Sequence, residues 1–525
     1  MVRAHPWWMM AVLASCTPLP QDTEPPAPPL LPRTLVAYEK MALFLEAPGQ
    51  ARLRGFTGAA PEGGVVEVRE GNTTLAQVTA DAAGRFDVRF GAEKDREVEL
   101  HARVGTEDAT PLRFKVRDFS EAASSMVRER LSGTGSTPNQ VLFARDASPT
   151  GRTTGLVVLS GDGALDNVDA DEGGRVSPLV PLPEMAFGGA VVPATPWAAD
   201  ALGENAWVTR YAHAGITTVN VPGGTILGEG NITTPQALGE ILTLDPPVDV
   251  DGDGVEDQQV TALVPRNPTG IAVVGSRAFV AMANVLSTSA SGRAQFGPGM
   301  LAVFELDGRG IPTGATRVIN LAFRNPQHVI PLDNGTVAVS STGSLQRVNG
   351  TWQVDSDGGV EIFDVSSLQK LQEINLGRFA PSRPLLLADG KSLYVPSILR
   401  ARLARLDVEN GQLIRGPGNP VELAEGELLR TVFECVLHPT ALVFCGLFDT
   451  DSIVVVDSAD DTVRPWPFTS DIRVNTGDSA VRLGIQSLAM RPGRNGVDRA
   501  GNDILVLLSL ATRVSALDTR FVLGP

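Results

Sequence analysis

Hydrophobic and polar residues alternate with a period of two between residues 47 and 117. Phe86 and Phe90 fall on one face of one strand, and Val98 and Leu100 fall on one face of the next. Clusters of glycine and aspartate separate such runs. This combination predicts short antiparallel strands with one buried face. We therefore expect a small β-sandwich at 47–117.

One turn in this segment has a distinctive sequence, DAAGRFDV, from Asp81 to Val88. It resembles the D-x-x-G-x-F-x-V hairpin of bacterial Ig-like and carboxypeptidase-regulatory-like modules. The resemblance implies an Ig-like sandwich that acts as a spacer or adhesion unit, and it brings no catalytic residues.

The connection at 118–136 is expected to contain a helix. Asp118 and Glu121 have the spacing of a capping box, and Gly133 provides a stop. The apolar residues between them fall on one helical face. We expect this helix to pack between two domains, with an interface for a partner as the alternative.

From 137 to 525 the chain repeats an apolar strand that ends in an acid. The examples are LAVFELD ending at Asp307, VEIFD at Asp364, LARLD at Asp407, IVVVD at Asp457 and VSALD at Asp518. A second apolar strand precedes each of them. Two strong and two weaker strands in every unit of about 40 to 50 residues predict a β-propeller. The acids are expected to cap turns.

These paired strands are similar to the surface-antigen and lactonase-like group of propellers, in which a strand near "VYVAN" precedes one near "VSVID". Six repeats can be counted, and GLVVLSGD at 155–162 indicates a seventh, closed by pairing with the C-terminal segment. We favour seven blades, with six or eight as alternatives. The overall expectation is an all-β chain.

An acidic loop, DVDGDGVED, lies at 249–257 within an insertion at 229–265. Its start resembles an EF-hand-type loop, but Val260 stands where a bidentate glutamate would be. The loop is therefore similar to the helix-free calcium loops of many secreted proteins. Calcium favours such oxygen ligands. The expected ligands of a structural Ca²⁺ are the carboxylates of Asp249, Asp251, Asp253 and Asp257 and the carbonyl of Val255. A solvated acidic turn is the alternative.

The chain has three cysteines. Cys435 and Cys445 lie in two apolar runs on either side of a His-Pro-Thr turn, so a hairpin would place them opposite each other. An oxidising compartment would then allow a disulfide. Two buried free thiols are the alternative.

The N-terminus has the layout of a secretory signal at 1–15, with a short apolar run after Arg3. The tetrapeptide LASC, ending at Cys16, resembles the lipobox of bacterial lipoproteins. The resemblance implies acylation of Cys16 and an outer-membrane anchor, facing either the periplasm or the exterior. An ordinary signal peptide with a chance LASC is the alternative. The proline-rich segment 16–46 is expected to be a spacer.

The formal net charge is −16, so we do not expect nucleic acid as a partner, and we expect membrane contact only through the lipid. No nucleophile elbow, zinc-protease motif or phosphate-binding glycine loop occurs in the sequence. His213 and His328 lie in different expected blades, whose loops could bring them to a central channel.

Together these features favour a non-enzymatic cell-envelope lipoprotein whose propeller binds a protein or an envelope polymer. A lactonase-like hydrolase with its site in the propeller channel is the main alternative. A purely structural envelope protein is a third interpretation.

Overall fold

The computed structural model describes residues 41–118, 127–131, 138–144, 154–169, 180–463, 470–471, 484–490, 505–510 and 513–518. Short gaps inside these ranges fall at 56–58, 83, 110, 188–189, 193, 252, 289–293, 333, 349–350, 425–430, 439–441 and 451. All regular elements within the described ranges are β-strands. A search of the same residues for a helix able to cross a membrane finds none.

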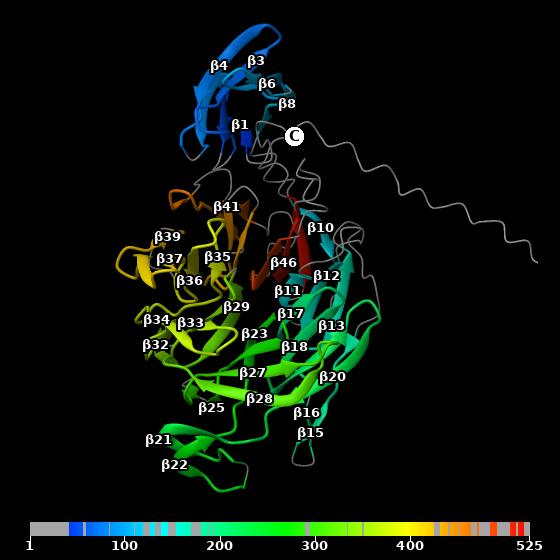
Figure 1. Cartoon of the computed structure of the whole chain (residues 1–525), viewed down its shortest axis with the longest axis vertical. Coiled ribbons are helices and arrows are strands. Elements are labelled where there is room, and N and C mark those ends of the chain that lie inside the picture. The colour runs from blue at the N-terminus through cyan, green and yellow to red at the C-terminus, as the bar shows by residue number, and fades with distance from the viewer. Residues whose placement is uncertain are drawn as a thin grey trace, which may run out of the picture.

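The N-terminal domain is a β-sandwich of two sheets (Figure 1). One sheet has the order β5 (Phe86–Gly91), β2 (Gln50–Gly55), β1 (Met41–Ala47) and β9 (Arg117–Asp118). The other has the order β4 (Thr73–Thr79), β3 (Val65–Glu70), β6 (Glu97–Val104) and β7 (Glu107–Asp108), and β8 (Leu112–Lys115) also pairs with β6. Because β1 begins at Met41, the sandwich starts six residues before the predicted boundary at 47.

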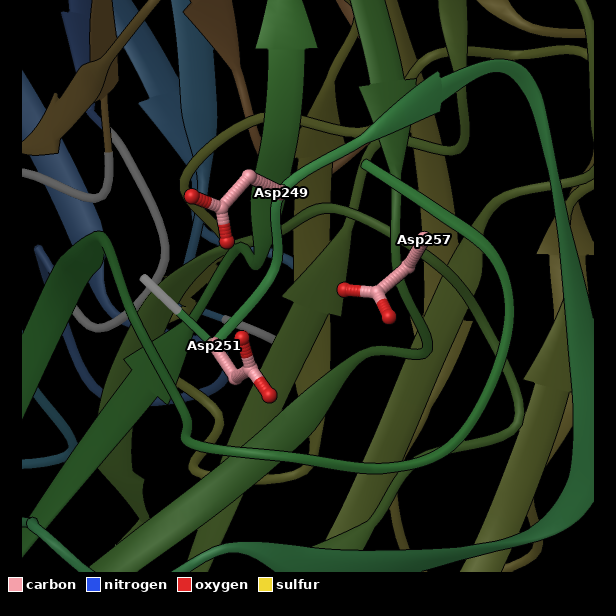
Figure 2. Close-up of side chains that lie close together, drawn as sticks. All are labelled: Asp249, Asp251 and Asp257. Atoms are coloured by element: carbon pink, nitrogen blue, oxygen red, sulfur yellow. The ribbon is translucent and has the colours of Figure 1, made fainter. Parts of the chain in front are cut away.

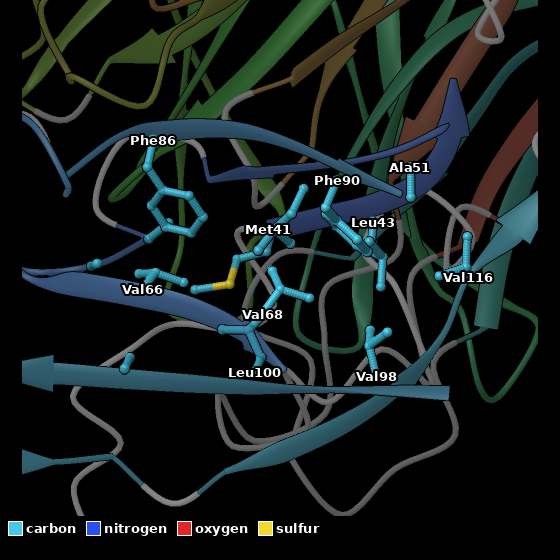
Figure 3. Packing of buried hydrophobic residues seen from close by; sticks show 14 of the residues in the cluster. Met41, Leu43, Ala51, Val66, Val68, Phe86, Phe90, Val98, Leu100 and Val116 are labelled. Atoms are coloured by element: carbon cyan, nitrogen blue, oxygen red, sulfur yellow. The ribbon is translucent and has the colours of Figure 1, made fainter. Parts of the chain in front are cut away.

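The two sheets enclose a hydrophobic core (Figure 3). Phe86 and Phe90 of β5 are each 5% exposed, and Val98 and Leu100 of β6 are each 1% exposed. The period-two pattern of the sequence therefore matches the buried faces of these strands. The expected turn is also present, since the amide of Gly84 donates to the carbonyl of Asp81 at 2.8 Å.

The predicted helix at 118–136 is wrong over β10 (Val127–Leu131), which is a strand. This strand pairs antiparallel with β47 (Arg513–Asp518), close to the other end of the chain. The pairing fills an edge of a sheet, and this tertiary gain outweighs the helical spacing of the local sequence. The other residues of the expected apolar stripe lie outside the described ranges.

The larger domain is a ring of four-stranded antiparallel sheets, some with a fifth short strand. Seven such sheets occur within the described ranges. Each has a first, second, third and fourth strand, and these lie side by side in that order. They are β11 (Pro138–Phe143), β12 (Thr154–Leu159), β13 (Ala164–Asp169), β14 (Val180–Pro181); β17 (Pro196–Leu202), β18 (Asn205–Arg210), β19 (Gly215–Asn220), β20 (Thr225–Asn231); β23 (Pro268–Val274), β24 (Arg277–Met282), β27 (Met300–Leu306), β28 (Pro312–Asn320); β29 (Pro326–Leu332), β30 (Thr336–Ser341), β33 (Gly359–Asp364), β34 (Lys370–Asn375); β35 (Leu385–Leu386), β36 (Ser392–Pro396), β37 (Arg402–Asp407), β38 (Gln412–Arg415); β40 (Cys435–Leu437), β41 (Leu442–Leu447), β42 (Ser452–Asp457), β43 (Thr462–Val463); and β45 (Ser487–Met490), β46 (Leu505–Leu510), β47, β10.

The first strands of these sheets lie toward the centre of the ring, and the fourth strands lie at its rim (Figure 1). β11 contacts both β17 and β45, so the first and last sheets meet. The last sheet takes three strands from the C-terminal part of the chain and its fourth, β10, from the N-terminal side. This domain is a β-propeller.

A long hairpin projects from the ring between the second and third sheets (Figure 1). Its strands are β21 (Gln236–Val248) and β22 (Asp257–Leu263), and the acidic loop joins them. Leu238, Leu242 and Leu244 are buried in one core with residues of the neighbouring sheets. The insertion predicted at 229–265 is therefore a hairpin, although its first residues belong to β20.

Candidate functional site

The first strands of the propeller surround a cavity of about 200 Å³. Every sheet contributes to its lining. Each first strand, or the one or two residues before it, supplies one of the following lining residues, in chain order: Gln140, Ala198, Gly270, His328, Arg383, Glu434 and Ser487. The cavity is therefore a central channel in which side chains far apart in the sequence converge, as is usual for ligand sites on such scaffolds.

A repeated X-Pro dipeptide brings the chain into this channel. Five of the seven residues come two positions after a proline, and these prolines are Pro138, Pro196, Pro268, Pro326 and Pro381. The preceding residue has a positive φ at four of the five sites, for example 56° at Asn267 and 55° at Asn325. Asparagine tolerates this conformation better than most residues. The bend turns the chain from the rim of one sheet into the first strand of the next.

Glu434 is the one carboxylate among the described residues that line the cavity. Its Oε1 lies 2.8 Å from Nη1 of Arg383. Its Oε2 accepts hydrogen bonds from the Ser487 hydroxyl at 2.5 Å and the Leu488 amide at 3.2 Å. Burial raises the pKa of Glu434, and Arg383 and these hydrogen bonds oppose that rise. The carboxylate thus links three neighbouring sheets and is neutralised by Arg383.

His328 lies in the channel on the other side of Arg383 along the ring. Burial lowers the pKa of His328 to about 3, and the charge of Arg383 adds to the effect. The imidazole is therefore neutral at pH 7. His213, the other histidine considered for the channel, is buried in the turn between β18 and β19 and does not line the cavity.

Two buried amide atoms at the channel have no hydrogen-bond partner among the described residues. They are Nδ2 of Asn139 and Oε1 of Gln486. Asn139 lies on β11 and Gln486 immediately precedes β45, so the two come from neighbouring parts of the ring. An unmet donor or acceptor in a protein interior costs about 1–3 kcal/mol. Such groups at a cavity are candidates for ligand contact.

The channel also has an aromatic sector. Trp197 lines the cavity, remains 38% exposed and packs on Tyr211 with 4.8 Å between ring centroids. Phe433 lines another part and meets Phe448 edge to face at 5.4 Å. The aromatic rings are thus held in place by second rings outside the cavity.

Most residues of this channel were not predicted from the sequence, because no local motif marks them. The X-Pro dipeptides at 138, 196, 268, 326 and 381 were the available signal, since they recur at intervals of 55 to 72 residues. The last two channel positions lack the proline, with Val432 and Ile485 in its place. Of the lining residues, the sequence indicated His328 alone.

The acidic loop brings three of its four predicted carboxylates together (Figure 2). One oxygen from each of Asp249, Asp251 and Asp257 lies within 4.8 Å of the others. Calcium–oxygen distances of about 2.3–2.6 Å allow ligand oxygens up to about 5 Å apart. Asp253 does not join them, because its Oδ1 accepts the amide of Val255 at 2.8 Å.

Further hydrogen bonds close this loop. The amide of Gly254 donates to Asp249 at 2.9 Å, and the amide of Val250 donates to Asp257 at 3.0 Å. Arg266 donates to the carbonyl of Val250. Burial lowers the pKa of Arg266, and the charge of Asp249 opposes this. The loop is thus preshaped and has one nearby cation that partly balances its charge.

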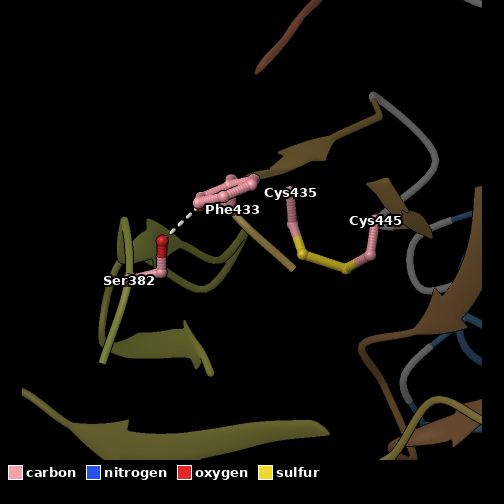
Figure 4. Close-up of a disulfide and its surroundings, with 4 residues drawn as sticks. All are labelled: Ser382, Phe433, Cys435 and Cys445. Carbon is pink, nitrogen blue, oxygen red and sulfur yellow. Dashed lines mark hydrogen bonds between the residues drawn. A yellow bond between two sulfur atoms is a disulfide. The ribbon is translucent and has the colours of Figure 1, made fainter. Parts of the chain in front are cut away.

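Cys435 and Cys445 form a disulfide and lie directly opposite each other on β40 and β41 (Figure 4). Cys435, one end of this bond, comes directly after the channel residues Phe433 and Glu434 in the sequence. The carbonyl of Phe433 also accepts the hydroxyl of Ser382 at 2.5 Å. The disulfide and this hydrogen bond therefore both hold this part of the channel wall in place.

Four of the five predicted acids at strand ends cap turns, and the residues after the fifth, Asp518, lie outside the described ranges. Oδ1 of Asp307 accepts the amides of Arg309 and Ile311 at 2.8 and 2.9 Å. Asx-type bonds of this kind stabilise a tight turn locally. Equivalent bonds from amides two or three residues later are made at Asp364, Asp407 and Asp457.

Cys16, the signal at 1–15 and most of the spacer at 16–46 lie outside the described residues. Their chemistry therefore stays a prediction from the sequence.

No protein-family model and no curated protein matches the chain. Among solved structures, it is similar to a streptogramin B lyase at 10% identity and a TM-score of 0.47, covering 74% of this chain and 96% of that one. It is similar to the hydrazine synthase of Kuenenia stuttgartiensis at 13% identity and a TM-score of 0.48, covering 74% and 97%. For a virginiamycin B lyase from Staphylococcus aureus the values are 9%, 0.46, 74% and 97%. These neighbours are β-propellers, and at such identities the likeness concerns the fold alone.

Proposed function

We propose that this chain is a cell-envelope lipoprotein whose propeller binds part of an envelope polymer or protein in its central channel. The observation that supports this most is the convergence of polar side chains from several sheets on one cavity, with Asn139 Nδ2 and Gln486 Oε1 lacking partners there among the described residues. A rigid ring with functional groups at its centre suits recognition.

The N-terminal region supports the location. In this proposal Cys16 carries the acyl chains and the proline-rich spacer holds both domains away from the membrane. The β-sandwich would act as a further spacer. The disulfide between Cys435 and Cys445 suits an oxidising envelope compartment.

A hydrolase at the channel is the second candidate, and His328 is the observation that favours it. A histidine that lines a cavity is a candidate general base, although a pKa of about 3 makes His328 a weak one at pH 7, and the hydrolase therefore ranks second. Glu434 is less suited to that role because Arg383 and Ser487 already occupy its oxygens.

We also propose that the acidic loop binds a structural Ca²⁺. The converging oxygens of Asp249, Asp251 and Asp257 support this, and solvent, Asp253 after a side-chain rotation, or the carbonyl of Val255 would complete the ligand set. The ion would stiffen the tip of the β21–β22 hairpin.

The binding proposal can be tested on the full lipidated chain in detergent. A hot-water extract of the producing cell's envelope is the probe, and the melting temperature is the measurement. We expect the extract to stabilise the wild type but not the double variant Asn139→Leu/Gln486→Met. Equal stabilisation of both proteins, or of neither, would contradict binding in the channel.

The same extract distinguishes a hydrolase from a binding protein. If catalytic amounts of the wild type convert an extract component and His328→Gln does not, the hydrolase is favoured. Stoichiometric binding without conversion favours the binding protein. A [³H]palmitate label lost in Cys16→Ala would support the lipid anchor, and a label retained in that variant would contradict it.

A further inference from the structure

We propose that the ligand group held in the channel is a neutral sugar unit, bound through its hydroxyl groups. This inference rests on the proposed function and specifies the chemistry of the same site. Four features of the channel lead to it: its charge balance, its unpaired amide atoms, its aromatic wall and its size.

The charge balance favours an uncharged ligand. Arg383 and Glu434 form an ion pair, so their charges cancel within the channel. His328, the third titratable residue among the described residues of the lining, is neutral at pH 7 because burial lowers its pKa to about 3. A charged ligand group would lose its hydration there without gaining a free counter-charge.

The two unpaired amide atoms are buried beside the cavity and have almost no accessible surface, so each side chain must turn slightly for its atom to meet a ligand. They then require both an acceptor and a donor from the ligand. Nδ2 of Asn139 needs an acceptor, and Oε1 of Gln486 needs a donor. A hydroxyl group can do both, so neighbouring hydroxyls on one sugar ring satisfy the two amides in either orientation. A purely apolar ligand would leave both groups buried and unmet.

Trp197 supplies the apolar side of the site. Its ring lines the cavity, is 38% exposed and is braced by Tyr211. The face of an aromatic ring carries partial negative charge, which suits the positively polarised C–H groups on the face of a sugar ring. Asn139, Gln486 and Trp197 come from three consecutive sheets, and their polar and aromatic groups match the two kinds of surface on a pyranose.

The size of the channel limits the ligand to about one unit. Its volume is about 200 Å³. This lies below the range of about 300–1,000 Å³ for sites that enclose drug-sized molecules. The sugar can therefore be free or the terminal unit of an envelope polysaccharide, and the chemistry of recognition is the same in both cases.

Isothermal titration calorimetry on the full chain in detergent tests this directly. The probes are glucose, galactose, mannose and N-acetylglucosamine, together with short oligosaccharides that end in each of them. We expect at least one sugar to bind. A response to both forms indicates a terminal unit, and a response to the monosaccharide alone indicates a free sugar as the source.

The variants locate the binding. Gln486→Met and Asn139→Leu should each weaken the affinity about 2- to 10-fold, the worth of one hydrogen bond. Each should leave the melting temperature of the free protein unchanged or higher, because a buried unmet group is removed. Gln412→Met, on the exposed strand β38, is the matched control and should bind as the wild type does.

Four outcomes would overturn the inference. A sugar that binds Gln486→Met as tightly as the wild type is not in the channel. If no sugar binds but N-acetylglycinamide does, the ligand is an amide. If the sugars are silent while the envelope extract still stabilises the wild type alone, the channel binds something else and the proposed function survives. If the extract is silent as well, both proposals fail.

Discussion

The β-sandwich and the β-propeller use the same period-two strands, but they fill their centres differently. Between the two sheets of the sandwich lie hydrophobic side chains such as Met41, Val68 and Leu100, each 1% exposed (Figure 3). The propeller places its hydrophobic residues between neighbouring sheets and leaves polar groups at its axis.

The difference follows from geometry. Two stacked sheets have a single interior, and apolar residues must fill it to offset the entropy lost on folding. A ring of sheets has an interior between every pair of blades, so the axis is not needed for the core and is free to carry polar residues. The sandwich core therefore serves stability, and the propeller axis is where the proposed ligand would bind.

The largest effect should come from the sandwich core. Leu100→Ala removes a fully buried side chain and should lower the free energy of unfolding of the sandwich by about 2–5 kcal/mol. Chemical denaturation, monitored by hydrogen exchange, should show that this loss of stability is confined to residues 41–118. Propeller protection and ligand binding should stay unchanged, and a parallel loss in the propeller would show that the two domains unfold together.

The disulfide should matter only to the propeller. Cys435→Ala/Cys445→Ala opens a loop with a sequence separation of 10 and should lower propeller stability by about 3 kcal/mol. Reduction of the wild type by dithiothreitol is the matching treatment. An unaltered denaturation midpoint after confirmed reduction would contradict a stabilising role.

Acid should separate the two domains further. Burial lowers the pKa of His328 and of His438 to about 3. The unfolded chain binds these protons near pH 6.5, so their contribution to stability is complete above that pH and is lost as the pH falls toward 3. We expect propeller stability to fall over this window, by up to about 1.4 kcal/mol per pH unit for each histidine.

The controls for this prediction are a variant and a domain. His328→Gln/His438→Gln should show a flatter pH dependence of the propeller transition. The sandwich transition, followed in the same experiment, is the domain control, because neither of these two histidines lies in the sandwich. Glu434 acts in the opposite sense, because its raised pKa gives stability that is present below about pH 4.5 and is lost as the pH rises. Propeller stability independent of pH between 6.5 and 3 would contradict the account.

Calcium should give the smallest effect, confined to the hairpin. At a free concentration 100 times the Kd, one bound ion stabilises the state that binds it by about 2.7 kcal/mol, and less reaches the global transition if the hairpin opens locally. Slower hydrogen exchange at 248–257 on addition of Ca²⁺ is the expected result. Asp251→Asn should abolish it, and equal protection by Mg²⁺ would argue against a calcium site.

How much could be predicted from the sequence depended on how local the signal was. The strand alternation near Phe86 and the turn caps at Asp307 and its equivalents are set by neighbouring residues, and both were found. The strand at Val127–Leu131 was missed because its partner, β47, lies near the other end of the chain. The pairing energy that fixes it is absent from any local window.

The two candidate sites differ in the same way. The acidic loop is contiguous, so spacing alone identified Asp249, Asp251 and Asp257 as neighbours. The contact of Asp253 with the Val255 amide is a detail of loop geometry that spacing does not determine. The channel joins residues from 139 to 487, and only a global repeat of X-Pro dipeptides could have indicated it.

A crystal structure of the full chain saturated with the sugar that binds most tightly would test the central claim most directly. We predict density for one sugar unit in the central channel, with hydroxyl groups within hydrogen-bond distance of Asn139 Nδ2 and Gln486 Oε1 and with the ring against Trp197. Ordered water at both amides, with the sugar elsewhere or absent, would contradict the account.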